Sequence, residues 1–113
     1  MSVNAVTDAT FETEVYQSDI PVLVEFGTEW CVPCKQIEPS LNALAGEFSG
    51  KVKVLKADVD QIPDVAMRLG VRGIPALFVF QDGQVTANRT GAASKRVLQD
   101  WLEASVSIDN VTD

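Results

Sequence analysis

The sequence predicts an α/β protein with a mixed central sheet of about five strands, flanked by about four helices. Three observations favour this class: apolar runs of strand length alternate with segments of helical period, the pair Asp82-Gly83 separates the last two strand-like runs, and both cysteines lie where a strand turns into a helix. The expected order is β-α-β-α-β-α-β-β-α. Strands joined by helices are expected to run parallel, and the hairpin adds an antiparallel edge.

The chain begins with a weakly signalled strand over residues 2–6 and a helix over about 10–17, for which Thr7 or Asp8 can serve as N-cap. Pro21 then opens an apolar strand over 22–26. Side chains alternate along a strand, so one face carries Leu23, Glu25 and Gly27, and the other carries Val22, Val24 and Phe26. Both faces are mostly apolar, which indicates a central strand covered on both sides.

The two cysteines, Cys31 and Cys34, follow this strand directly and precede a helix that runs to about Phe48. A helix start carries unpaired backbone N–H groups and the positive end of the helix dipole. A thiol placed there ionises more easily, and the thiolate is the reactive form. Cys31 is therefore better placed to react, and we expect Cys34, inside the first turn, to be more shielded.

The second half of the chain supplies three strands and two helices. A strand over 51–58 precedes a short helix over 63–69, which Pro63 opens and Gly70 closes. The hairpin joins a strand over 76–80 to a polar edge strand over about 84–90. The last helix covers about 94–104, and its apolar face is expected to hold Val97, Leu98, Trp101 and Leu102.

Length and composition limit the function classes. The 113 residues suffice for a single domain, expected over 1–106 with a flexible tail over 107–113. Nine basic and 16 acidic residues give a net charge of −7, which argues against nucleic acid and anionic membranes as partners. No apolar run approaches the ~20 residues of a membrane helix, and no basic segment followed by an apolar one opens the chain. We therefore expect a reducing cytoplasm, where paired cysteines indicate redox or metal chemistry. We also expect a monomer.

The chain resembles the thioredoxin family over about residues 5–104. The matching residues are Phe26, Trp30, Cys31, Pro33, Cys34, Lys35, Pro39, Lys56, Asp60, Gly73, Ile74, Pro75, Asp82, Gly83 and Gly91. This resemblance implies a thioredoxin fold and a dithiol–disulfide oxidoreductase that reduces disulfides in substrate proteins. It also implies a cis Pro75 that faces the cysteines, with the backbone of Ile74 pairing with substrate. The other substrate-binding residues would be Trp30, Val32, Pro33 and Gly91.

In this interpretation Cys31 is the nucleophile and Cys34 the resolving thiol of a redox-active disulfide, with no other cofactor. The chain has no glycine-rich dinucleotide fingerprint, so its electrons must come from a separate reductase, linked to NADPH or to ferredoxin. Alternatives are two inert cysteines or a static disulfide, an oxidase or isomerase of the same fold, and a non-catalytic binding subunit or co-chaperone. A zinc site generally needs four ligands, and two cysteines without histidine do not supply them.

Three residues near the cysteines depart from the family pattern: Val32 stands where thioredoxins usually have Gly, Gly27 where they have an aromatic, and Glu25 where they have Asp. A carboxylate in a central strand is costly unless it is paired or functional. Glu25 is thus either a proton acceptor for Cys34, a partly solvated side chain, or a structural ion pair with Lys56. Lys56 in turn either pairs with Glu25 or is an ordinary exposed lysine. Trp30 either forms a docking surface with Pro33 or packs locally to support the loop.

Overall fold

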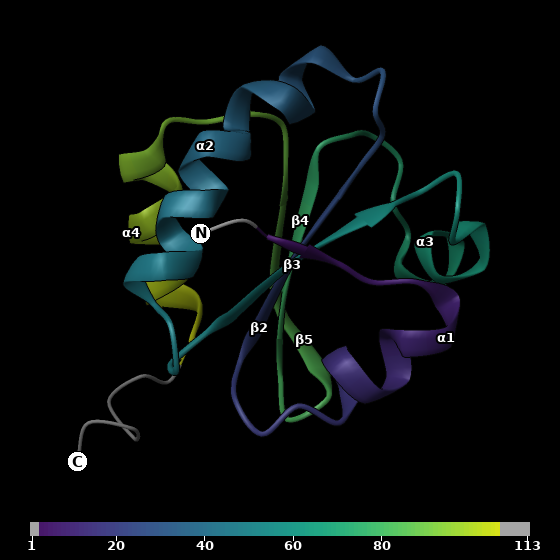
Figure 1. Cartoon of the computed structure of the whole chain (residues 1–113), viewed down its shortest axis with the longest axis horizontal. Helices are drawn as coiled ribbons and strands as arrows, with labels where there is room; N and C mark the ends of the chain where they lie inside the picture. Colours follow the sequence, from purple (N-terminus) through teal and green to yellow (C-terminus); the bar gives the residue numbers. More distant parts are fainter. Residues whose placement is uncertain (1–2, 107–113) are drawn as a thin grey trace.

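The computed structural model describes residues 3–106, which fold as a central sheet with helices on both faces (Figure 1). Helices α2 and α4 cover one face, and α1 and α3 lie on the other. The sheet has five strands in the order β1-β3-β2-β4-β5, which confirms the expected mixed α/β class. The strands are β1 (Asn4–Ala5), β2 (Val22–Gly27), β3 (Lys53–Asp58), β4 (Ala76–Gln81) and β5 (Gln84–Thr90). The helices are α1 (Asp8–Phe11), the π-helix η1 (Glu12–Tyr16), α2 (Val32–Glu47), α3 (Pro63–Leu69) and α4 (Lys95–Ser105).

Strand β2 lies at the centre of the sheet, and all six of its residues are buried. Its Val22, Val24 and Phe26 join the core under α1, η1 and α3, whereas Leu23 joins the core under α2 and α4. Glu25 and Gly27 share the face of Leu23 because side chains alternate along a strand. The predicted alternation therefore turns the only carboxylate of β2 toward the helix that carries Cys34.

The first helix differs from the sequence-based expectation of 10–17. It begins at Asp8 after the N-cap Thr7, whose backbone N–H donates to Thr10 Oγ1 at 2.9 Å, and it then widens into the π-helix η1. The N–H of Gln17 donates to the carbonyl of Glu12 at 3.0 Å, five residues back, as π-helical geometry requires. This wider turn brings residues five apart together, and the ring centroids of Phe11 and Tyr16 lie 5.3 Å apart.

The direction of β4 corrects another expectation. Although α3 joins β3 to β4, β2 pairs in parallel with β3 and antiparallel with β4. The seven residues of α3 span about 10 Å, at ~1.5 Å per residue, whereas the six of β3 span about 20 Å, at ~3.3 Å per residue. The short helix by itself does not carry the chain back along the sheet, and β4 starts at the end where β3 finishes.

Several local signals hold as predicted. Gly70 ends α3 with φ of 76°, and the hairpin residues Asp82 and Gly83 have φ of 54° and 77°, the positive values of a type I′ turn. Ser94 caps α4 by accepting a hydrogen bond from the N–H of Val97 at 3.3 Å. However, the side chain of Val97 is 45% exposed, because Leu98 and Leu102, four residues apart, define the buried stripe of this helix.

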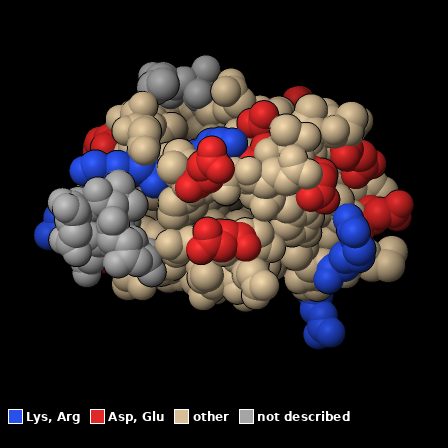
Figure 2. Space-filling view, turned by 90° about the horizontal axis from the view of Figure 1, so that it is seen from below, with Lys and Arg blue, Asp and Glu red and all other residues tan. Residues whose placement is uncertain are grey.

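The expected tail over 107–113 lies outside the residues that the structure describes. Between residues 3 and 106, no helix combines the length and the apolar character needed to cross a membrane. Figure 2 views the molecule from the lower edge of Figure 1 and shows acidic side chains scattered over this face, with Lys and Arg at the left, at the lower right and near the upper centre. This distribution agrees with the net charge of −7.

Candidate active site

The two cysteines lie at the first turn of α2 and form a disulfide. Cys31 is the N-cap of the helix, and its Sγ accepts a hydrogen bond from the backbone N–H of Cys34 at 3.2 Å. This bond uses one of the N–H groups that a helix start leaves unpaired, and it favours negative charge on the Cys31 sulfur. The structure thus confirms the predicted position of Cys31 at the helix start.

The exposed fractions of the two cysteines differ less than expected. Cys31 is 5% exposed and Cys34 is 3% exposed, so both sulfurs are shielded. Their neighbours differ more. Cys31 lies between Trp30, 72% exposed, and Val32, 65% exposed, whereas Cys34 is directed toward the buried face of β2.

Glu25 is the buried carboxyl beside Cys34. It is 5% exposed, and its Oε2 has no hydrogen-bond partner within residues 3–106. Burial, with a smaller contribution from Glu38, raises the pKa of Glu25 from 4.5 to about 7, although Lys56 and Lys35 oppose the shift. Near neutral pH this carboxyl is thus present in both its charged and its neutral form, which suits a group that exchanges protons.

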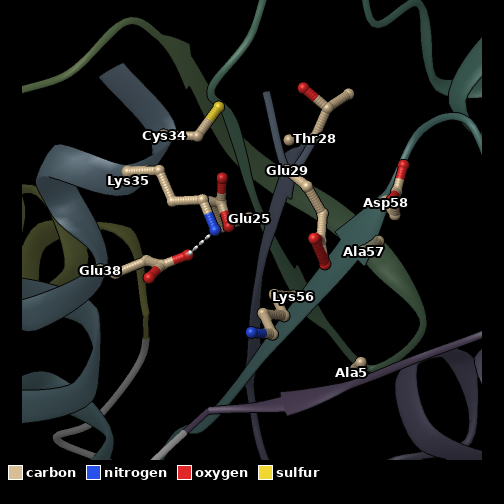
Figure 3. Close-up of a pocket in the computed structure, with 11 residues that line it drawn as sticks. Ala5, Glu25, Thr28, Glu29, Cys34, Lys35, Glu38, Lys56, Ala57 and Asp58 are labelled. Atoms are coloured by element: carbon tan, nitrogen blue, oxygen red, sulfur yellow. Dashed lines mark ion pairs between the residues drawn. The ribbon is translucent and has the colours of Figure 1, made fainter. Parts of the chain in front are cut away.

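Lys56 faces Glu25 across the sheet, because the two residues pair in register between β2 and β3. No direct ion pair joins them in the described part of the chain; Lys56 is exposed, and Lys35 pairs with Glu38 at 3.8 Å instead. The positive charge of Lys56 therefore acts on the pKa of Glu25 through space. Figure 3 shows Glu25 between α2, which carries Cys34, Lys35 and Glu38, and β3, which carries Lys56 and Asp58.

A pocket with a volume of about 160 Å³ lies between these elements. Both Glu25 and Cys34 line it, so the carboxyl and the resolving thiol share one cavity (Figure 3). Its other lining residues are Ala5, Gly27, Thr28, Glu29, Lys35, Glu38, Lys56, Ala57 and Asp58. Charged side chains make up much of this lining, which suits a route for protons between Glu25 and solvent.

Backbone pairing gathers further site residues at the end of the sheet where β2 runs into the cysteine loop. Ala76 pairs with Phe26, so the cis bond between Ile74 and Pro75 lies at this end, and the cis geometry agrees with the family resemblance. The carbonyl of Pro75 accepts a hydrogen bond from the N–H of Gly91 at 2.8 Å. Ile74 and Gly91 are half-buried, and Pro75 is buried.

Trp30 is held at this end as well. Its Nε1–H donates to Oδ2 of Asp60 at 3.3 Å, and Asp60 follows the end of β3. The indole is tied at one point while most of its surface stays exposed, as are Val32 and Pro33. This geometry favours the docking interpretation of Trp30 over local packing alone.

Reasoning from the sequence missed two contributors to this site. Glu38 raises the pKa of Glu25, and its position four residues after Cys34, on the same face of the helix, is the signal that could have identified it. Thr28 is buried, and its Oγ1 has no partner among the described residues. No pattern in the sequence marks Thr28. It lies just after β2, where the alternation of strand side chains no longer predicts which residues are buried.

A pair of cysteines at a helix start can alternate between a dithiol and a disulfide, and it passes two electrons in each cycle. Together with this fold, the pair defines a dithiol–disulfide oxidoreductase, a protein that catalyses thiol–disulfide exchange.

Comparisons with known proteins agree with that class. The family model described as Thioredoxin matches residues 2–104. Proteins named thioredoxin from Pseudomonas aeruginosa and Rhodospirillum rubrum are each 48% identical over 101 residues, which is 89% of this chain. The matched region covers 94% of the Pseudomonas aeruginosa protein and 97% of the Rhodospirillum rubrum protein. The thioredoxin of Rickettsia felis is 42% identical over 103 residues, 91% of this chain and 98% of that protein. The chain belongs to the thioredoxin family.

Proposed function

We propose that this oxidoreductase reduces disulfides in substrate proteins and that Cys31 attacks first. The observation that carries the proposal is the disulfide between Cys31 and Cys34 at the first turn of α2. The position of Cys31 at the helix start favours its thiolate. The pair itself holds the two electrons that are transferred, so the reaction needs no bound cofactor.

The reaction proceeds through a mixed disulfide. The Cys31 thiolate attacks one sulfur of the substrate disulfide, forms a bond to it and releases the other sulfur as a thiolate. Cys34 then loses its proton and attacks the Cys31 sulfur, which breaks the bond to substrate. The substrate leaves fully reduced, and the protein keeps the Cys31–Cys34 disulfide.

Glu25 accepts the proton that Cys34 loses in the second step. Its carboxyl lies beside Cys34 in the shared pocket, and a pKa raised to about 7 matches the pH at which such a base works best. Lys56 acts through its charge, which limits the rise of that pKa. The proton then passes to solvent through the pocket.

Substrate proteins dock on the exposed surface around Cys31. Trp30, Val32 and Pro33 supply its apolar part. The backbone of Ile74 pairs with an extended segment of the substrate, and Pro75 and Gly91, which are hydrogen-bonded to each other, contact that segment beside it. The sequence Cys-Val-Pro-Cys forms an atypical active site of the family. Val32 stiffens its loop, because a β-branched residue restricts the backbone more than Gly does.

A separate thioredoxin reductase, linked to NADPH or ferredoxin, returns electrons to the pair. Residues 1–106 act as one domain, as a monomer and in the cytoplasm, where a reducing environment makes a structural disulfide unusual and favours a transient catalytic one.

Reduction of insulin disulfides by the reduced protein tests the activity itself. Cys34→Ser should accumulate mixed disulfides with substrate, and Cys31→Ser should accumulate few, because only Cys31 makes the first attack. Glu25→Gln should leave the first step nearly intact and slow the second, most clearly near pH 7. Equal trapping by both cysteine variants contradicts the assignment of the nucleophile, and an unchanged second step makes Glu25 a structural residue.

A further inference from the structure

Gly27 lies where the carboxyl of Glu25 and the sulfur of Cys34 come together. A Cβ atom on Gly27 would lie 2.5 Å from Oε2 of Glu25 and 2.8 Å from Sγ of Cys34. Real Cβ atoms essentially never approach other atoms this closely. The space in which a side chain would begin is thus already filled by the two groups that exchange the proton.

The backbone gives no other reason for glycine at this position. Gly27 is the last residue of the regular strand β2, and it is not among the glycines with positive φ, which are Gly50, Gly70, Gly83 and Gly91. Glycine weakens a strand and often marks a site of close approach. Here the approach is between two side chains. The carboxyl oxygen of Glu25 lies 2.5 Å and the sulfur of Cys34 2.8 Å from the same Cβ position, so these two atoms are close neighbours.

We propose that Gly27 is a positioning residue that leaves the room in which the carboxyl of Glu25 reaches Cys34 directly. Glu25 and Gly27 share one face of β2, two residues apart, so the longer acidic side chain folds over the place where the side chain of residue 27 would lie. The extra methylene of Glu relative to Asp and the missing side chain at position 27 are then two parts of one arrangement. This inference rests on the proposed role of Glu25 as proton acceptor.

Charged groups surround the pair on several sides, and each contributes to its pH dependence. They lie on α2, on β3 and in the loop after β2: Lys35, Glu38, Lys56, Asp58 and Glu29. None of these is altered by a change at Gly27. A change at Gly27 therefore isolates the contact between carboxyl and thiol from the electrostatics of the pocket.

The test is a double-mutant cycle of Gly27→Ala and Glu25→Asp, followed in a single turnover with 5,5′-dithiobis(2-nitrobenzoic acid). The first thionitrobenzoate released reports attack by the more reactive thiol, Cys31, and the second reports resolution by Cys34. Gly27→Ala should slow the second release about tenfold or more when residue 25 is Glu, and flatten its pH dependence near 7. In the Glu25→Asp background the same change should slow the second release at least about threefold less than it does with Glu, because the shorter carboxyl has withdrawn from the Cβ and only the contact with Cys34 remains.

An equal slowing in both backgrounds overturns the inference, since the added methyl group would then act on the Cys34 sulfur alone. This result differs from a failure of the proposed function, in which Glu25→Gln leaves the second release unchanged. The first release is the internal control and should stay the same in every variant. If Gly27→Ala folds poorly, urea denaturation of the four proteins gives the same cycle: the loss of stability should be smaller in the Glu25→Asp background, and equal losses refute the shared space.

Discussion

Glu25→Gln should make the oxidised protein more stable at alkaline pH and leave its stability in acid nearly unchanged. Burial raises the pKa of Glu25 in the folded protein to about 7, whereas 4.5 is the ordinary value for an unfolded chain. Between these two pH values the folded state binds more protons than the unfolded state. The stability of the unaltered protein must therefore fall as pH rises through this window, and Gln, which does not titrate, escapes that loss.

The size of the effect follows from the two pKa values. The difference between 4.5 and about 7, at about 1.36 kcal/mol per pH unit, corresponds to roughly 3 kcal/mol. The opposing charges of Lys56 and Lys35 are already included in the value of about 7. The advantage of the variant should thus grow from near zero at pH 4 to roughly 3 kcal/mol at pH 9, a large part of the stability of a small domain.

Urea denaturation of the disulfide form, at several pH values from 4 to 9, measures this directly. The disulfide form is the right one because its cysteines do not titrate. Glu103→Gln, which removes the same charge from the exposed side of α4, is the matched control and should show little change with pH. A difference between Glu25→Gln and the unaltered protein that does not depend on pH would refute the raised pKa. A variant that becomes less stable at high pH would show that Lys56 holds the carboxylate favourably.

Three further outcomes are expected from the same site. Glu38→Gln should move the midpoint of the Glu25 titration to lower pH, because the negative charge of Glu38 raises that pKa; a midpoint that stays in place contradicts this coupling. Trp30→Ala should raise KM for a protein disulfide about tenfold and leave the alkylation rate of Cys31 by iodoacetamide unchanged, because the indole is exposed and its proposed role is docking. Asp60→Ala should raise the same KM less, about two- to fivefold, because it only frees the indole from one exposed hydrogen bond of 3.3 Å; an effect as large as that of Trp30→Ala would assign Asp60 its own contact with substrate.

The fold was predictable wherever local chemistry decides it. Residues with special backbone preferences, such as Gly70 and the Asp82-Gly83 pair, mark their turns directly. The direction of β4 was not predictable in this way, since it depends on whether a short helix spans the length of the sheet. The π-helix was also missed, because no propensity of its residues marks the wider turn that brings Tyr16 against Phe11.

In the candidate site, too, local features were predictable from the sequence, and contacts between distant residues were not. The spacing of Cys31 and Cys34 after an apolar strand is a local signal, and alternation along β2 correctly placed Glu25 on the face of Leu23. The direct ion pair between Glu25 and Lys56, one of the alternatives drawn from the sequence, is absent from the described residues, although the two are in register. Register places the backbone of Lys56, but its long side chain gains more by staying in water than by entering the sheet face.

The pairing of β2 with β4 matters differently for the cysteine pair and for the proposed docking surface, because only the docking surface depends on contacts between distant parts of the chain. The cysteines, their helix start and Glu25 all belong to one continuous stretch of chain, from β2 into α2. The surface at Ile74, Pro75 and Gly91 reaches them only because Ala76 is aligned with Phe26 across the sheet. A molecule that loosened along β4 and β5 would therefore keep its cysteine pair at the helix start and lose the proposed docking surface. In the proposed function, thiol reactivity is a local property of this chain, whereas selectivity depends on long-range order.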